Sequence, residues 1–231
     1  MDMIGGDQIT AARLTDWRKL AQGLHARYVV DDFASGAALV AAVGEAVDDV
    51  GDHLRATVGD GFVDLRLISL DAVYRDGDGG EHVVEWVTQR DLDLAAQITA
   101  VAAGLGARPD PAGLAAVELA LDTAHGDEVA RFWSALLTGG DEALGRGTIG
   151  NDVRDAQGRV PYLWFQETEE HEAPRQRFHL DIFVPRDHAE ARIAAAVAAG
   201  GTVVSENDGY TILADRDGNQ ACVNLSSPLA E

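Results

Sequence analysis

The residues with the clearest potential for chemistry lie in the segment RFHLD, residues 177–181, where polar and apolar side chains alternate. Successive side chains of a β-strand point to opposite faces, so Arg177, His179 and Asp181 should share one face. An imidazole transfers protons near neutral pH and also ligates metal ions, which makes His179 a candidate catalytic residue. We interpret this face as the lining of a pocket, with a solvated outer face of the strand as the alternative.

The C-terminal half reads as an internal repeat of two segments of about fifty residues each. Superposing the first strands of the two copies sets Glu118 against His179, and superposing the last strands sets Gln166 roughly against Cys222. Hydrophobic periodicity predicts a βαβββ order, or one close to it, in each copy. The expected elements are the strand 115–122, the helix 127–137 and the strands 148–153 and 160–166 in the first copy, and the strand 177–184, the helix 187–199 and the strands 202–206, 210–214 and 219–225 in the second.

Two prolines in three residues, Pro109 and Pro111, mark the boundary with the N-terminal half. Because proline interrupts helices and central strands, we divide the chain into domains of residues 1–108 and 112–231. The mixture of helices with hairpin-linked strands favours an α+β fold. The expected elements of the first domain are helices at 15–25 and 34–50, a helix capped by Thr88, and strands at 27–31, 63–67 and 82–87.

The chain carries 39 acidic and 18 basic residues, which gives a net charge of −21. A field of this sign repels phosphate backbones and anionic lipids, so neither nucleic acid nor a membrane is an expected partner. No apolar run approaches the length of a membrane span, and we expect a soluble cytoplasmic protein. The single cysteine, Cys222, excludes an intramolecular disulfide and any site built from several thiolates of one chain.

Six motifs of the C-terminal half belong together. They are VELALD, ARFWSALL, WFQ, RFHLDIFVP, AAGG and ILADRDGNQACV. Through them, residues 114–226 resemble the glyoxalase-like branch of the vicinal oxygen chelate superfamily. The resemblance implies a half-barrel of two modules with a divalent metal at Glu118, Gln166, His179 and Cys222. It implies His179 and Glu118 as metal ligands and catalytic residues, on a scaffold that hosts many different reactions.

A metal-free pocket is the alternative, because the four positions offer only one imidazole and one carboxylate beside an amide and a thiol. A non-haem iron site, in contrast, uses two imidazoles and one carboxylate. In this interpretation Glu118 and His179 line a polar pocket floored by Trp164 and Phe165, and Cys222 is a small buried apolar residue. In both interpretations we predict that substrate is contacted by Trp164, Gln166, Arg177 and Asp181.

The N-terminal half also carries a family resemblance, through LTDW, FASGAALVAAVGEA, VDLRL and VTQRDLDLA. With these motifs residues 13–106 resemble pterin-4a-carbinolamine dehydratase, in the form fused to a glyoxalase-like domain. That family removes water from a 4a-hydroxytetrahydropterin with histidines as proton carriers. Its His-His-Pro run falls on Asp52-His53-Leu54 here, and its later histidine falls on Leu70. Only His53 remains as an acid–base candidate in these positions.

Three functions follow as hypotheses. The first is a small-molecule lyase, nominally a 4a-hydroxytetrahydrobiopterin dehydratase, in which His53 performs acid–base catalysis on a cyclic metabolite. The second places the activity in the glyoxalase-like pocket, as an isomerase, lyase or oxygenase with or without a divalent metal. The third is a non-catalytic small-molecule binding or resistance protein. Both resemblances imply a homodimer, and all three hypotheses take a small molecule as the partner.

Overall fold

The computed structural model describes residues 1–127, 129–130, 133–134, 142–158, 160–170, 178–198, 201–214 and 220–225. These residues form two compact units, one of residues Met1–Leu114 and one of residues Ala115–Leu225. Each unit combines helices with sheets, which confirms the predicted α+β class. No helix in the described ranges has both the length and the apolar character needed to cross a membrane.

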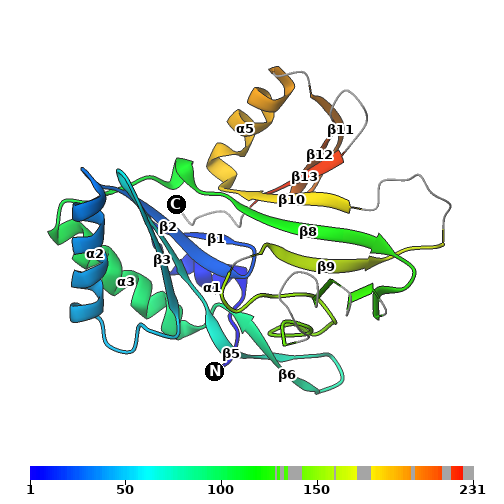
Figure 1. Cartoon of the computed structure of the whole chain (residues 1–231), viewed down its shortest axis with the longest axis horizontal. Helices are drawn as coiled ribbons and strands as arrows, with labels where there is room; N and C mark the ends of the chain where they lie inside the picture. The colour runs from blue at the N-terminus through cyan, green and yellow to red at the C-terminus, as the bar shows by residue number, and fades with distance from the viewer. Residues whose placement is uncertain are drawn as a thin grey trace. The chain divides into compact units, whose positions relative to one another are not determined.

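The N-terminal unit is built on an antiparallel sheet with the strand order β1-β2-β4-β3, and β7 adds a short pairing to β2. A separate hairpin, β5-β6, follows in the chain (Figure 1). The elements of this unit are α1 (Gly6–Ala11), β1 (Arg18–Leu20), β2 (Gly23–Val29), α2 (Phe33–Ala46), β3 (Leu54–Gly59), β4 (Phe62–Leu67), β5 (Ser69–Arg75), β6 (Glu81–Trp86), α3 (Gln89–Gly104), β7 (Arg108–Pro109) and the short 3₁₀ turn η1 (Pro111–Gly113).

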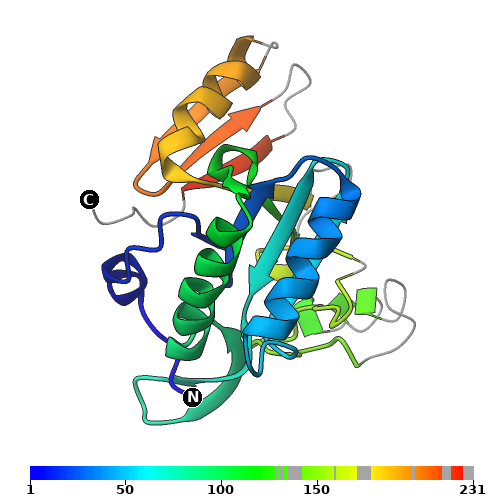
Figure 2. The same ribbon diagram turned by 90° about the vertical axis from the view of Figure 1, so that its left-hand side faces the viewer.

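Helices α2 and α3 lie side by side on one face of this sheet (Figure 2). Alternation along the strands places Leu24, Ala26 and Tyr28 of β2 on that face, where all three are buried in the same core as Leu39 of α2 and Ile98 of α3. The alternating pattern thus gives the sheet one apolar face, and the apolar stripes of the two helices cover it.

The predicted helix at 15–25 is wrong, because this segment forms β1 and the start of β2. The spacing of Trp17, Leu20 and Leu24 resembles a helical stripe, but the chain reverses at Ala21, which has a positive φ of 48°. The prediction of a helix after Thr88 is confirmed, since Thr88 is the N-cap of α3. Strands β3 and β5 were not expected from the sequence pattern.

The C-terminal unit contains one six-stranded sheet with the order β11-β12-β13-β10-β8-β9. The first strands of the two copies, β8 and β10, pair antiparallel at its centre, and each pairs in parallel with the last strand of its own copy (Figure 1). The internal repeat is therefore visible in the sheet. Its elements are β8 (Ala116–Thr123), β9 (Tyr162–Glu167), β10 (Phe178–Val184), α5 (Arg186–Ala198), β11 (Thr202–Asn207), β12 (Tyr210–Ala214) and β13 (Gln220–Leu225).

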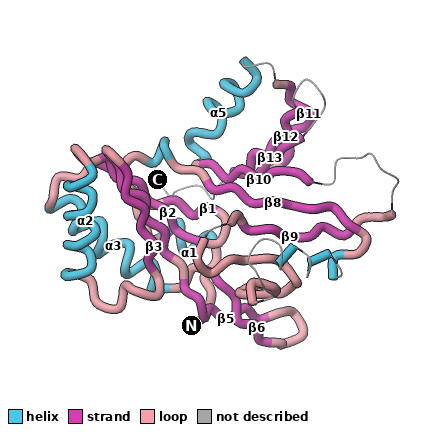
Figure 3. The backbone as a smooth tube through the Cα atoms, viewed as in Figure 1, coloured by secondary structure: helices cyan, strands magenta, loops and turns pink. Residues whose placement is uncertain are grey.

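Helix α5 covers one face of this sheet on the side of β11, β12 and β13 (Figure 3). Val184, Val223 and Ala189 form the buried contact between helix and strands. In the first copy, Leu121 and Leu163 point to the same face of the sheet as α5 and are buried near Ala143 and Val153. The residues that alternate with these buried ones along the strands therefore point to the opposite face.

The first copy is less regular than predicted. The expected strand 148–153 is a series of turns with single bridges at Val153, because Gly145 and Gly147 take positive φ values and reverse the chain. Of the expected helix 127–137, the described residues 127, 129–130 and 133–134 are helical, and the rest lies outside the described residues.

The register of the last strands also differs from the expected superposition, by two residues. Trp164 lies opposite Ala120, and Cys222 lies opposite Asp181. Ala120 comes two residues after Glu118, and Asp181 comes two residues after His179. Since Glu118 and His179 are equivalent in the repeat, Cys222 is equivalent to Trp164 and not to Gln166.

Candidate functional site

The face of the C-terminal sheet away from α5 carries the side chains predicted to do chemistry. Glu118 on β8, Trp164 and Gln166 on β9, and His179 and Asp181 on β10 all border one cavity of about 750 Å³. This volume is in the range of small-molecule sites. The alternation of residues 177–181 thus indicated a pocket lining for His179 and Asp181, while Arg177 lies outside the described residues.

Sequence reasoning did not predict that further residues line this cavity, although alternation along the strands could have found several of them. They are Asp122, Phe178, Phe183, Tyr210, Ile212, Gln220, Cys222 and Asn224, of which only Cys222 had been considered. Asp122 and Phe183 stand four residues from Glu118 and His179 on the same strands, and Gln220 and Asn224 stand two residues from Cys222, so extended alternation would have included them. Tyr210 and Ile212 lie on β12, which carried no predicted site residue, and they reach the cavity through its pairing with β13.

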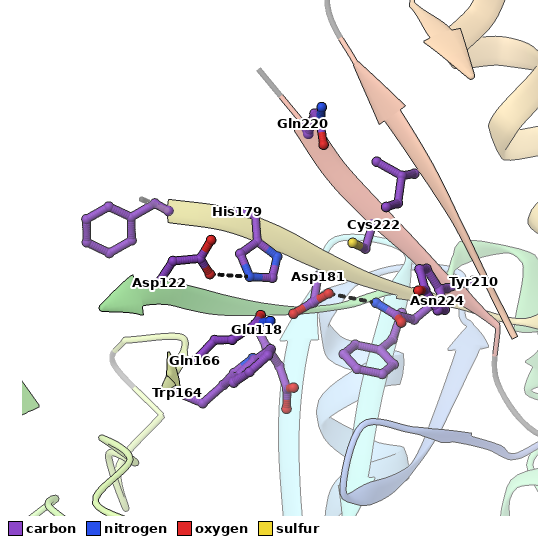
Figure 4. A pocket seen from close by; sticks show the side chains of 13 residues that line it. Glu118, Asp122, Trp164, Gln166, His179, Asp181, Tyr210, Gln220, Cys222 and Asn224 are labelled. Atoms are coloured by element: carbon purple, nitrogen blue, oxygen red, sulfur yellow. Dashed lines mark hydrogen bonds and ion pairs between the residues drawn. The ribbon is translucent and has the colours of Figure 1, made fainter. Parts of the chain in front are cut away.

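His179 contacts a carboxylate and an aromatic ring. Its Nε2 lies 3.3 Å from Oδ1 of Asp122, which is an ion-pair distance, although the angles are not those of an aligned hydrogen bond (Figure 4). The ring of Trp164 meets the imidazole edge to face, with centroids 5.7 Å apart. These two contacts hold the imidazole at the cavity wall.

Asp181 is buried beside two polar partners. Its Oδ1 accepts a hydrogen bond of 3.0 Å from the amide of Asn224 (Figure 4). Burial raises the pKa of the Cys222 thiol to about 11, and the negative charge of Asp181 and its hydrogen bond with that thiol add to the shift. The thiol is therefore protonated at neutral pH in the metal-free protein.

The four metal-ligand positions implied by the resemblance do not form one group. The donor atoms of His179, Asp181 and Cys222 all lie within 4.8 Å of one another, and Glu118 is not part of this group. The strand register explains why Glu118 is outside the group. Asp181 on β10 lies between its two neighbours, opposite Glu118 on β8 and opposite Cys222 on β13. Two strand spacings, about 9–10 Å between backbones, therefore separate Glu118 from Cys222.

In the N-terminal unit, His53 pairs with a carboxylate that sequence reasoning missed. Nδ1 of His53 lies 2.9 Å from Oδ1 of the fully buried Asp91, and the imidazole keeps about 13% of its surface exposed. In the tautomer that donates Nδ1–H to the Asp91 carboxylate, Nε2 is left as a hydrogen-bond acceptor. This arrangement suits a base oriented by a carboxylate.

Asp91 is itself held by its neighbours. Its Oδ2 accepts hydrogen bonds from the hydroxyl of Ser69 at 2.7 Å and from the backbone N–H of Thr88 at 2.8 Å. Asp91 is the third residue of α3, where a carboxylate commonly bonds back to the N-cap. The segment Thr88–Asp91 was recognised as a helix start, and this signal could have identified Asp91.

The other histidines of residues 1–114 stand apart from His53. His82 bonds Asp76 within the β5-β6 hairpin, at 2.9 Å. His25 lies on β2, on the sheet face opposite the helices. Asp52, which precedes His53 in the chain, is exposed, and Leu70 stands in place of the family's later histidine. One imidazole therefore remains where the dehydratase family has three.

Comparison with known families gives two matches. Residues 5–101 match the pterin 4 alpha carbinolamine dehydratase family, and residues 118–224 match a glyoxalase-like domain. No curated protein matches the chain. Both families act on small molecules. This chain is accordingly a pterin-4a-carbinolamine dehydratase-like domain fused to a glyoxalase-like domain.

Proposed function

We propose that the glyoxalase-like pocket carries the activity of this chain, an acid–base transformation of lyase or isomerase type on a small polar metabolite. The observation that supports this most is the gathering of Glu118, His179 and Asp181 with Trp164 on the wall of one cavity of about 750 Å³. A concave site with a few convergent polar groups and an aromatic wall is what small-molecule chemistry requires.

Glu118 is the proposed proton acceptor. Its side chain is only about 6% exposed, and it borders the cavity from the central strand β8. A carboxylate in such a place can take a proton from a bound molecule without competition from bulk water. His179, oriented by Asp122, is the proposed contact to a substrate oxygen, either directly or through a metal ion.

Trp164 and Gln166 are the proposed positioning residues. They are neighbours on one face of β9, so a planar molecule stacked on the indole would have the amide within reach of its polar edge. A nucleophilic role for Cys222 is not part of the proposal, because the thiol is protonated at neutral pH.

Pterin dehydration in the N-terminal unit is the second candidate, favoured by the His53–Asp91 pair. The reaction needs one group to remove a ring proton and another to protonate the departing hydroxide. His53 supplies one of these, whereas Leu70 cannot transfer a proton. We therefore expect a slow dehydration that depends on His53.

The proposal is tested by ligand-observed NMR and turnover assays with a panel of polar carbonyl and cyclic metabolites that includes reduced pterins. Glu118→Gln tests the proton acceptor, and Glu190→Gln, an exposed carboxylate on α5, is the matched control. We expect a compound that binds both proteins but is converted about 10²- to 10⁴-fold more slowly by Glu118→Gln.

Two outcomes would contradict the proposal. One is a panel in which no compound binds the wild-type chain. The other is binding that is unchanged when His53, Glu118 and His179 are substituted together, with no turnover by the wild type. The second result would indicate the non-catalytic binding protein.

A further inference from the structure

The group formed by His179, Asp181 and Cys222 differs from the ligand set that the family resemblance implies. His179 and Asp181 are alternate residues of β10, and Cys222 lies directly opposite Asp181 on β13. Their donor atoms, a ring nitrogen, a carboxylate oxygen and a thiol sulfur, all lie within 4.8 Å of one another. Imidazole, carboxylate and thiolate are the three ligand types of protein zinc sites.

The contacts of His179 leave one ring nitrogen for a metal. Nε2 faces Oδ1 of Asp122 at 3.3 Å, and Nδ1 is on the side of the ring toward Asp181 and Cys222 in Figure 4. In the neutral tautomer with its proton on Nε2, on the side of the Asp122 carboxylate, the lone pair of the imidazole is on Nδ1. Metal-ligating histidines commonly have a carboxylate on the other nitrogen, which fixes the tautomer and ring orientation.

Asp181 is oriented in the same way. Asn224 donates a hydrogen bond to its Oδ1, the thiol of Cys222 is its other hydrogen-bond partner, and its side chain is buried at the cavity wall. A hydrogen-bonded partner of this kind keeps a ligating carboxylate in one orientation. Both donors on β10 therefore have an outer partner from a neighbouring strand, Asp122 from β8 and Asn224 from β13.

We propose that His179, Asp181 and Cys222 bind one divalent transition-metal ion, best matched by Zn²⁺, with a fourth position open to the cavity. The charges balance, because one carboxylate and one thiolate neutralise a divalent cation. Binding releases the thiol proton of Cys222 to solvent and changes no oxidation state. Ligand atoms around tetrahedral zinc lie about 3.3–3.8 Å apart, so side-chain movements of about 1 Å close the site.

This assignment separates the metal ligands from the proton acceptor. Asp181 takes the place that the family resemblance gives to Glu118, and Glu118 is left on the neighbouring strand β8, opposite Asp181. An open metal position polarises a substrate oxygen when it is occupied, while Glu118 holds or moves the proton. The inference rests on the proposed function only for this chemistry, since metal binding is measured without any substrate.

The test uses the full chain, freed of metal with a chelator and titrated with Zn²⁺ and with Co²⁺ as a spectroscopic probe. We expect one metal ion per chain and a near-ultraviolet charge-transfer band from thiolate-bound Co²⁺. Cys222→Ser should abolish that band. Asp122→Asn removes an outer partner of a ligand and should lower Zn²⁺ affinity roughly 10- to 100-fold. Asp181→Asn removes a ligand itself and should lower the affinity by more than this.

Asp208→Asn, which changes an exposed carboxylate in the β11-β12 turn, is the matched control and should bind Zn²⁺ as the wild type does. Glu118→Gln distinguishes the two ligand sets: because Glu118 lies outside the group, its replacement should keep one metal ion per chain and the thiolate band of Co²⁺. Circular dichroism checks that every variant is folded.

The proposal is overturned if the folded wild type binds no stoichiometric metal. It is also overturned if Glu118→Gln abolishes binding while Asp181→Asn and Cys222→Ser retain it, which would restore the implied ligand set. Stoichiometric metal with no ligand from the metabolite panel would refute the proposed function and leave the metal site standing. Conversion of a compound from the panel by a chain that binds no metal would refute the metal site and leave the proposed function standing.

Discussion

Among single residues, the polar groups of the two units differ in their surroundings: a buried hydrogen-bond network in one unit and a cavity wall in the other. In the N-terminal unit Nδ1 of His53 contacts two buried groups, the carboxylate of Asp91 at 2.9 Å and the hydroxyl of Ser69 at 3.3 Å. Asp91 is also bonded to Ser69 and to the start of α3. In the C-terminal unit several polar groups face a cavity. His53 and His179 were predicted from the sequence, but their partners Asp91 and Asp122 were not, because the contacts depend on how separate segments pack.

Replacement of Asp91 by Asn tests the buried network of the N-terminal unit. The amide has one acceptor oxygen where the carboxylate has two, so the donors from Ser69 and Thr88 lose charge-assisted bonds. We expect the free energy of unfolding to fall by about 1.5–3 kcal/mol. Urea unfolding measures this, and Asp93→Asn, an exposed residue of the same helix, should change it by less than about 0.5 kcal/mol. Equal effects of the two variants would contradict the assignment.

His25 gives the N-terminal unit a specific pH dependence. Burial, together with the positive charges of Arg66 and Lys19, lowers the pKa of His25 well below its ordinary value. The folded chain therefore keeps this ring neutral, while the unfolded chain binds a proton below about pH 6.5. Stability should fall as the pH drops below that value, with a slope of up to about 1.4 kcal/mol per pH unit from this residue.

The check is urea unfolding of the wild type and of His25→Gln between about pH 7.5 and pH 5.5, the range around the ordinary histidine pKa. The variant lacks the titrating ring, so its stability should change less over this interval. A slope in the variant that equals or exceeds that of the wild type would show that His25 is not responsible.

At the scale of elements, alternation was the most reliable sequence signal. It identified β4, β8, β10 and the pocket-facing side of β10, because a strand with one buried face must alternate. It failed where the backbone reverses, at Ala21 and around Gly145 and Gly147, since these reversals depend on φ values that the spacing of apolar residues does not report. The implied metal-ligand set stays a prediction, and the pairing of β10 with β13 adds Asp181 beside Cys222, which the spacing of residues could not indicate.

Two glycines of α2 should respond in opposite directions to alanine. A Cβ at Gly36 would lie 2.8 Å from Cγ1 of Val58 and 3.1 Å from Cγ2 of Val63, whereas a Cβ at Gly44 would meet nothing within 4 Å. Gly36→Ala should therefore destabilise the unit by about 1–3 kcal/mol through overpacking between α2 and the sheet. Gly44→Ala should stabilise it by about 0.5–1 kcal/mol.

Both variants are compared with the wild type by thermal and urea unfolding of the full chain, followed by circular dichroism and fitted with a transition for each unit. A Gly36→Ala variant as stable as the wild type would show that α2 does not approach β3 and β4 this closely.

At the scale of the whole molecule, the net charge of −21 is the dominant property. Self-repulsion of a strongly charged chain opposes the compact state, and salt screens it. We expect the free energy of unfolding to rise by about 1 kcal/mol when NaCl is raised from about 0.01 M to about 0.1 M, which corresponds to a rise in Tm of about 2–4 °C. Differential scanning calorimetry measures this, and a Tm that falls with added NaCl would contradict the expectation.

We propose that the chemistry of this chain resides in the glyoxalase-like pocket, while the dehydratase-like unit has kept its scaffold and lost most of its proton carriers. The decisive measurement is the turnover of 4a-hydroxytetrahydrobiopterin by the wild-type chain and by His53→Ala. We expect a wild-type rate at least about 100-fold below that of a dehydratase with all three histidines, because loss of one acid–base group lowers the rate by about that factor. A wild-type rate equal to that of such a dehydratase, abolished by His53→Ala, would contradict it.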